Sequence, residues 1–182
     1  MQFQMTSYIT KKDINSLGVF SDRKDNFDDD MEISAFIKFA KKFYKDNYEI
    51  KPKPFGNYDV DIGVYKENVL VSTVDVERWR HWDEDWPNNY RYISFLGRKE
   101  KFLKRSEDFA MVYFNKSLTK LLVVTKKDIV KYPTQEKFFS RFKKSDLVRQ
   151  IPFDCGRIYG KDLTNTEKKI FKNYREGDYL ND

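Results

Sequence analysis

Residues 58 to 79, YDVDIGVYKENVLVSTVDVERW, decide the fold because they combine two apolar runs with four regularly placed acids. Val60, Ile62 and Val64 form the first run, and residues 69–76 form the second. Short valine-rich runs of this kind predict buried strands. Buried carboxylates are costly unless they are paired or bind a metal, so the acids within these runs need an explanation.

The two runs predict a hairpin that turns near residues 66–68. Asp59 and Asp61 alternate with the apolar residues of the first strand, and Asp75 and Glu77 alternate with those of the second. Residues directly opposite in an antiparallel pair point to the same face of the sheet. If paired residue numbers sum to an even value, all four acids share one face, whereas an odd register mixes acids and valines on both faces. The apolar pattern therefore predicts one core face and one acidic face.

Four carboxylates on one face would raise each other's pKa values unless a cation lies among them. Mg²⁺ (or Mn²⁺) is the expected cofactor, because Mg²⁺ prefers oxygen ligands and takes only a few carboxylates together with waters. A metal held in this way can polarise a phosphate oxygen and activate a water. The alternative is a solvated end of the sheet, where the acids pair with nearby Arg78, Arg80, Lys51 or Lys53.

Length and composition predict one domain over residues 1–182, with a core at about 30–125 and a basic C-terminal part at 126–182. No apolar run approaches the roughly 20 residues that cross a bilayer, and the N-terminus lacks the order of a signal peptide, so no membrane association is expected. Cys155 is the single cysteine, which excludes an intrachain disulfide and favours a cytoplasmic setting.

Charge is unevenly distributed along the chain. Residues 98–149 contain fifteen Lys or Arg against six Asp or Glu, whereas residues 22–32 contain six acids and two bases. A basic half beside an acidic centre favours a polyanionic partner such as nucleic acid. Lysine-rich faces are also often merely solvated, so charge alone does not decide between these two interpretations.

The first expected helix covers residues 29–47, with acids 28–30 at its start, where they would cap it and complement its dipole. The remaining expected elements are a polar aromatic insert after residue 77, a helix that contains GRKEKF at 97–102, a second hairpin over 109–125, a helix over 134–142, a short strand or loop over 151–160, and a final helix from Thr164 to Tyr174 with a Thr164–Glu167 capping box. This order predicts a mixed α/β (α+β) fold with a central mixed sheet flanked by helices.

This arrangement resembles the PD-(D/E)xK nucleases, which have the restriction-endonuclease-like fold. The core of that family has a helix with a Glu, a strand that ends in the motif Asp, and a following strand with (Asp/Glu)-x-Lys. Here Glu32 on the first helix, Asp61 or Asp59 on the first strand, and DVE at residues 75–77 match in order and approximate spacing. The resemblance covers about residues 30–125.

The chain departs from the family motif at Glu77, which stands where the family has Lys. Some members of the family carry Glu at this position. The role of the Lys, which is to stabilise the attacking hydroxide or the charged phosphorane, then falls to another residue. Lys99 or Lys101, in GRKEKF, could reach back from the next helix, whereas Arg78 alternates away from the acidic face.

The resemblance implies a metal-dependent endonuclease that hydrolyses phosphodiester bonds, with DNA as the favoured substrate. The implied metal ligands are Glu32, Asp59, Asp61, Asp75 and Glu77, and the implied catalytic residues are Asp61, Asp75, Glu77, Lys99 and Lys101. The implied nucleic-acid contacts are Arg98, Lys99, Lys101, Lys104 and Arg105, which would make affinity strongly salt-dependent. The sequence leaves open whether the substrate is duplex or single-stranded, and a homodimer is compatible with it.

The main alternative is a non-catalytic domain of the same fold that binds nucleic acid or protein. The sequence YDVD also resembles the Asp-x-Asp of metal-dependent glycosyltransferases, but their nucleotide-binding domain is usually larger than this chain. His81 is the single histidine, and no Gly-x-Ser-x-Gly elbow or phosphate-binding glycine loop accompanies it.

The aromatic residues of the insert allow two interpretations. Trp79, Trp82, Trp86 and Tyr90 could stack on unpaired bases or pack into the core. Asp83, Glu84 and Asp85 among them would repel phosphate, which favours core packing.

Overall fold

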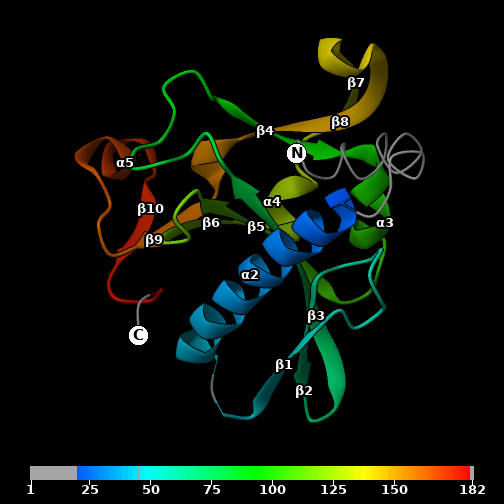
Figure 1. Ribbon diagram of the computed structural model, residues 1–182, viewed down its shortest axis with the longest axis vertical. Coiled ribbons are helices and arrows are strands. Elements are labelled where there is room, and N and C mark those ends of the chain that lie inside the picture. Colours follow the sequence, from blue (N-terminus) through cyan, green and yellow to red (C-terminus); the bar gives the residue numbers. More distant parts are fainter. Residues whose placement is uncertain (1–19, 45, 181–182) are drawn as a thin grey trace.

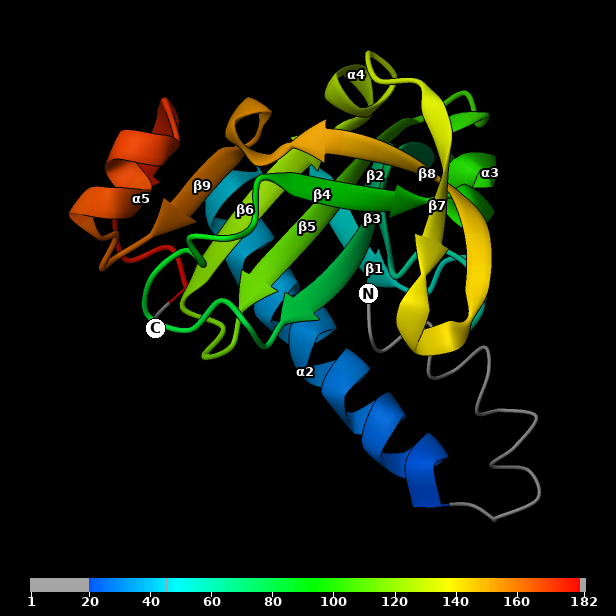
Figure 2. The ribbon, with the colours of Figure 1, turned by 90° about the horizontal axis from the view of Figure 1, so that it is seen from above.

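The computed structural model of the protein describes residues 20–44 and 46–180. A seven-stranded mixed sheet, a three-stranded sheet and one long helix make up most of the fold (Figures 1 and 2). The predicted mixed α/β class is therefore confirmed. Within the described residues, no helix has both the length and the apolar character needed to cross a membrane.

The helices and strands follow one another along the chain as follows. They are α2 (Phe20–Phe43), β1 (Tyr48–Pro52), β2 (Ile62–Lys66), β3 (Val69–Trp79), β4 (Tyr92–Leu96), the 3₁₀ turn η1 (Gly97–Lys99), α3 (Glu100–Leu103), β5 (Asp108–Asn115), β6 (Lys120–Thr125), α4 (Lys126–Ile129), β7 (Thr134–Phe139), η2 (Ser140–Phe142), β8 (Lys144–Pro152), η3 (Phe153–Cys155), β9 (Arg157–Gly160), α5 (Asn165–Ile170) and β10 (Asn173–Glu176).

The large sheet has the order β1-β2-β3-β5-β6-β9-β10. β3 pairs antiparallel with β2 and parallel with β5, so the chain must cross over between β3 and β5. That crossover contains β4, η1 and α3, and β4 belongs to the small sheet, whose order is β4-β8-β7. The chain thus lays part of a second sheet over the first before it returns to β5.

Both faces of β3 are covered. The small sheet packs on one face, where Ile93, Phe95 and Ile151 join Phe109, Met111 and Tyr113 of β5 in one core cluster. Helix α2 packs on the other face, where Ile33, Phe36, Phe39 and Ala40 meet Val74, Val76, Val112 and Phe114. From Thr73 to Glu77 every residue of β3 is buried, so this strand has no solvated face.

The first hairpin agrees with the predicted register. Ile62 pairs with Val74, the even register that would place residue 61 opposite residue 75. Glu67 and Asn68 form the turn with φ values of 51° and 64°, as tight two-residue hairpins require. A bulge after Val64 shifts the pairing only near the turn. The second predicted hairpin is confirmed as β5 and β6.

The first helix is longer at its start than the sequence pattern predicts. It begins at Phe20, so the acids at 28–30 lie within the helix and do not cap it. No proline or glycine occurs between residues 20 and 43, so nothing in this stretch breaks the helix. The helix ends at Phe43 and not near residue 47, because Asp46 and Asn47 favour the turn that leads into β1.

Two expectations about the C-terminal part are corrected. Residues 134–139 form strand β7 and not a helix, since they pair along their whole length with β8. Tertiary pairing here overrides the local helix pattern. The Thr164–Glu167 capping box is confirmed, but its helix ends at Ile170, and Tyr174 lies in β10 beside β9.

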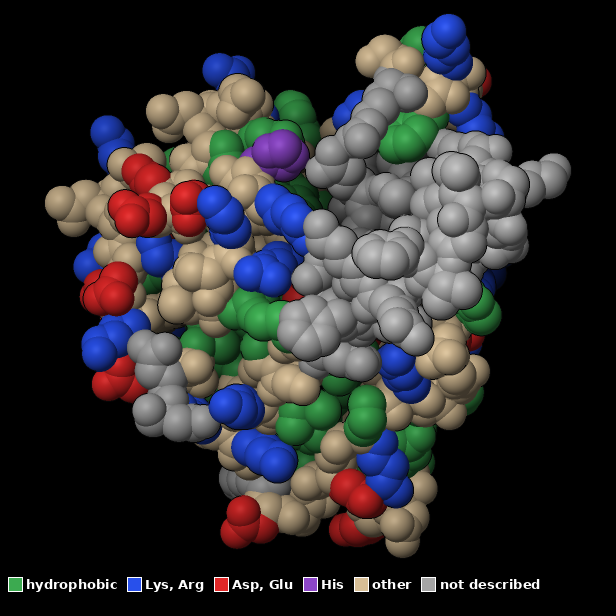
Figure 3. Space-filling model, in the orientation of Figure 1, with side chains coloured by type: hydrophobic (Ala, Val, Ile, Leu, Met, Phe, Trp, Pro, Cys, Tyr) green, Lys and Arg blue, Asp and Glu red, His purple; other side chains and the backbone are tan. Residues whose placement is uncertain are grey.

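The β7–β8 ribbon projects from the body of the molecule (Figures 1 and 3). The aromatic insert, by contrast, packs into the core, since Trp79, Trp82 and Trp86 are 7%, 0% and 2% exposed. Core packing is therefore the correct interpretation of these three rings.

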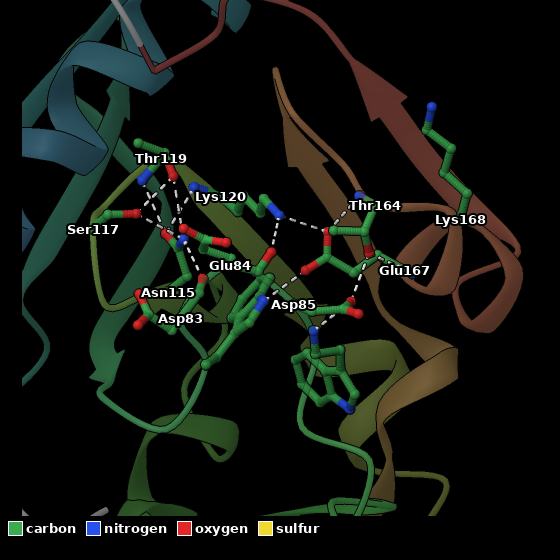
Figure 4. A network of polar contacts seen from close by, with 12 residues as sticks. Asp83, Glu84, Asp85, Asn115, Ser117, Thr119, Lys120, Thr164, Glu167 and Lys168 are labelled. Atoms are coloured by element: carbon green, nitrogen blue, oxygen red, sulfur yellow. Dashed lines mark hydrogen bonds and ion pairs between the residues drawn. The ribbon is translucent and has the colours of Figure 1, made fainter.

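A buried carboxylate anchors the insert (Figure 4). Trp82 Nε1 donates to Glu167 Oε1 at 2.8 Å, and Lys120 Nζ lies 2.9 Å from Glu167 Oε2. Lys120 also donates to the carbonyl of Glu84, and Thr164 Oγ1 donates to Asp85. Glu167 is fully buried, and these contacts join the insert, β6 and α5.

We expect Glu167→Ala to lower the free energy of unfolding by about 3 kcal/mol, since it leaves the Lys120 ammonium buried without its carboxylate. Urea denaturation at neutral pH measures the loss. Glu176→Ala is the matched control, because Glu176 forms an exposed pair with Lys168 and its loss costs less than about 1 kcal/mol. Equal losses in the two variants would show that Glu167 is no buried anchor.

Candidate active site

Two carboxylates and one ammonium meet between the two sheets. Lys99 Nζ lies 2.5 Å from Asp75 Oδ2 and 2.6 Å from Glu77 Oε1. Asp75, Glu77 and Lys99 are only 3%, 8% and 3% exposed. We call these three residues the Lys99 cluster. The Lys99 cluster makes burial of Asp75 and Glu77 on β3 tolerable, because each carboxylate is paired with the Lys99 ammonium and hydrogen-bonded to it.

The local fold explains how Lys99 reaches the two acids. Asp75 and Glu77 are two residues apart on one strand and share the face opposite to Val74 and Val76. The crossover to the parallel strand β5 passes over that face and carries Lys99 in its turn η1. Gly97 opens this turn, and a Cβ atom there would lie 2.8 Å from the carbonyl oxygen of Leu147. Only glycine lets the turn pass this close to β8.

Mutual charge fixes the ionisation of the cluster. Burial opposes the charged form of Lys99, but Asp75 and Glu77 outweigh burial and raise the pKa of Lys99 above its ordinary value. Burial likewise favours the neutral form of Glu77, yet the Lys99 ammonium opposes it and the pKa of Glu77 lies below its ordinary range. Lysine and glutamate therefore both stay charged at neutral pH.

The neighbouring strand β5 supplies two further residues to the cluster. Asp75 pairs in register with Met111 and Glu77 pairs with Tyr113, so these side chains share one face. Met111 Sδ lies 3.8 Å from Lys99 Nζ. Burial raises the pKa of Tyr113 well above its ordinary value, and the nearby carboxylates add to the effect, so the phenol stays protonated. Sequence reasoning missed both residues, because the parallel pairing of β3 with β5 has no local signal.

Asp61 and Asp59 take other partners. Asp61 lies just before β2 and not within it, and its Oδ2 accepts a hydrogen bond from Val76 N at 2.8 Å. Asp59 accepts from Arg105 Nη2 at 2.7 Å and from Val60 N at 2.7 Å. Burial opposes charge on Asp59, but Arg105 prevails and lowers its pKa. The four acids are therefore divided: among the described residues, Lys99 pairs with Asp75 and Glu77, whereas Arg105 pairs with Asp59.

Glu32 belongs to the helix that covers the opposite face of β3. It lies on α2 and is 5% exposed, and α2 packs against the face of β3 that carries Val74 and Val76. The described part of the chain contains no group of three or more His, Cys, Asp or Glu side chains placed to hold one metal ion. Mg²⁺ commonly takes only one or two carboxylates and completes its coordination with waters and substrate phosphate, so Asp75 and Glu77 match it in donor type, and Lys99 holds one oxygen of each. Within the described residues, no hydrogen bond engages Asp75 Oδ1.

The other expected basic residues lie around the cluster and not within it. Lys101 is 55% exposed, and its Nζ lies 3.9 Å from Asp59 and 3.4 Å from the carbonyl of Tyr58. Arg105 stacks on the ring of Phe55, with 4.3 Å from its Cζ to the ring centroid. Lys104 is exposed and Arg98 is half-buried. Of the two lysines expected to reach the acidic face, Lys99 does so and Lys101 lies beside Asp59.

Two other reactive side chains stand apart from this cluster. His81 is exposed and stacks on Tyr90, with ring centroids 6.0 Å apart. Burial raises the pKa of Cys155 to about 11, so its thiol stays protonated at neutral pH.

No known protein family, curated protein or solved structure matches the chain.

Replacing the buried ammonium tests the cluster directly. We expect Lys99→Met to lower the free energy of unfolding by about 3–5 kcal/mol at neutral pH, because two buried carboxylates lose their cation. Urea denaturation of the variant and of the wild type at a series of pH values measures the effect. Lys101→Met is the matched control and should cost less than about 1 kcal/mol, since Lys101 is largely exposed.

The lowered pKa of Glu77 and the raised pKa of Lys99 determine how stability changes with pH. In the wild type, the lowered pKa of Glu77 stabilises the fold above the unfolded value of about 4.3, and this stabilisation is lost as pH falls. The raised pKa of Lys99 stabilises the fold below about 10.4, and this is lost as pH rises through the folded value. Without Lys99, burial would raise the pKa of Glu77, so the deficit of Lys99→Met should shrink as pH falls. A deficit that stays constant between pH 4.5 and 8 would contradict this account.

Proposed function

We propose that the protein is a Mg²⁺-dependent nuclease that hydrolyses phosphodiester bonds of DNA at the Lys99 cluster. The observation that carries the proposal is the position of Lys99 Nζ, within 2.6 Å of carboxylates from both Asp75 and Glu77. The PD-(D/E)xK motif has an Asp on one strand and, on the next strand, an acid followed two residues later by a lysine, a position that Glu77 occupies here. In this chain a lysine from the following turn meets the two acids.

Each residue of the cluster has a chemical role in this proposal. Asp75 and Glu77 would hold Mg²⁺, which when bound activates a water and neutralises charge on the phosphate. Lys99 has three N–H donors, and two of them point to the carboxylates. Its third faces the thioether of Met111, a weak acceptor that a phosphate oxygen could replace. Lys99 would therefore hold the phosphate oxygen that gains charge.

Surrounding residues would position the substrate. Tyr113 keeps its proton and can donate a hydrogen bond beside Glu77. The exposed side chains of Lys101 and Lys104 can attract the phosphate backbone, whereas Arg105 is held by Asp59 and Phe55 and would orient the surface. Such contacts predict strongly salt-dependent binding. The single cysteine is consistent with the cytoplasm as the compartment.

A second candidate is a non-catalytic domain that binds nucleic acid or protein. One observation favours it. The Lys99 ammonium already pairs with both carboxylates, and among the residues that the structure describes no larger metal-ligand group occurs. In that case the cluster would only stabilise the fold.

Cleavage assays separate the two candidates. We expect the purified protein to cut DNA with Mg²⁺ or Mn²⁺ and not with EDTA, and we expect Asp75→Asn to reduce the cutting rate at least 100-fold, on the order of magnitude lost with a key electrostatic group. Linear, circular and single-stranded DNA and RNA are the substrates. Binding of the same DNA is measured in EDTA and should be retained in the variant.

Asp162→Asn is the control, since it removes the same charge from an exposed position. Cutting by Asp75→Asn at the wild-type rate would show that the site is wrong. If no substrate is cut under any condition while salt-sensitive DNA binding persists, the non-catalytic candidate is supported.

A further inference from the structure

The outer part of the β7–β8 hairpin is a two-stranded ribbon. β4 pairs only with residues 148–152 of β8, whereas β7 pairs with β8 from residue 144 to residue 149. Residues 136–147 therefore extend past the third strand, and they form the projection visible in Figures 1 and 3. We call residues 136–147 the outer ribbon.

Three described lysines of the outer ribbon form no ion pair with any described carboxylate. Lys143 and Lys144 are exposed at its tip. Lys137 is half-buried, and its Nζ donates to the hydroxyl of Ser94 at 3.1 Å. In the described part of the chain no carboxylate lies within ion-pairing distance of these three lysines. Burial without a counter-charge lowers the pKa of Lys137, so a phosphate nearby would stabilise its charged form.

The outer ribbon also exposes apolar side chains. Phe138 and Leu147 are 61% and 54% exposed. Their register positions place them on one face of the ribbon, since Glu136 pairs with Leu147 and Phe138 pairs with Ser145. Exposed apolar side chains on a projecting element are costly to leave in water, and the lysines beside them complement a polyanion in charge.

The base of the ribbon is fixed to the segment that carries Lys99. Arg149 donates two hydrogen bonds to Glu100, at 2.6 and 2.9 Å, and a third to the carbonyl of Tyr132 at 2.5 Å. Glu100 directly follows Lys99, and Gly97 lies against Leu147. The base of the outer ribbon is thereby fixed to the segment that supplies Lys99.

We propose that the outer ribbon binds duplex DNA through the major groove, with Lys143 and Lys144 on its phosphates. The choice of nucleic acid rests on the proposed function. A two-stranded ribbon fits the major groove of B-form DNA, which is about 12 Å wide. The deep and narrow major groove of A-form RNA does not admit such an element. Single strands are held mainly by several stacked aromatic rings, and among described residues Phe138 is the one largely exposed ring of the outer ribbon.

Binding measurements in EDTA test the ribbon without any cleavage. We expect Lys143→Gln/Lys144→Gln to weaken duplex DNA binding by on the order of tenfold and to reduce the slope of log K against log salt by about 1.8, as two lost phosphate contacts require. Fluorescence anisotropy with labelled duplex DNA, duplex RNA and single-stranded DNA gives both quantities. The wild type should prefer duplex DNA to the other two ligands.

Lys169→Gln/Lys172→Gln is the matched control, because it removes two exposed lysines near α5. Lys143→Arg/Lys144→Arg should keep wild-type binding, and urea denaturation verifies that all variants fold. Unchanged affinity and slope in Lys143→Gln/Lys144→Gln overturn the proposal, as does equal or better binding of RNA or single strands. Loss of binding in that variant supports the ribbon even if the wild type cuts nothing, so the nuclease and the ribbon can fail separately.

Discussion

The Lys99 ammonium allows a strand with two acids to lie between two layers of the fold. Without it, Asp75 and Glu77 would require water, and the small sheet could not cover the face of β3 that carries them. A buried ion cluster rarely stabilises a protein more than apolar packing of the same volume would.

The cluster depends on the short segment that supplies the lysine. Arg149 holds Glu100 at the start of α3, and just beyond its end Arg105 is held by Asp59. The two contacts reach in different directions, one to the small sheet and one to the loop before β2. Lys99 lies next to the first of them. A movement of either surface element would therefore be transmitted to the position of its ammonium.

Local patterns in the sequence predict several parts of this arrangement. The alternation of valines with acids gives the register in which Ile62 pairs with Val74, and the spacing of GRKEKF suggests a lysine that reaches back. Contacts between distant segments explain the failures. The strand over residues 134–139 depends on its pairing with β8, and the separation of Asp59 and Asp61 from the cluster depends on Arg105 and on the start of β2 at Ile62, after both acids. Neither contact leaves a local signal.

The three tryptophans of the chain lie in one place, which gives the protein a built-in optical probe. The ring of Trp86 lies 5.6 Å from that of Trp79 and 5.0 Å from that of Trp82, measured between centroids. Trp79 is two residues beyond Glu77 on the same face of β3, and Trp82 donates to Glu167. Because all three indoles report on this one region, the intrinsic emission spectrum monitors the junction between the insert, the C-terminal helix and the end of the strand that bears the two acids.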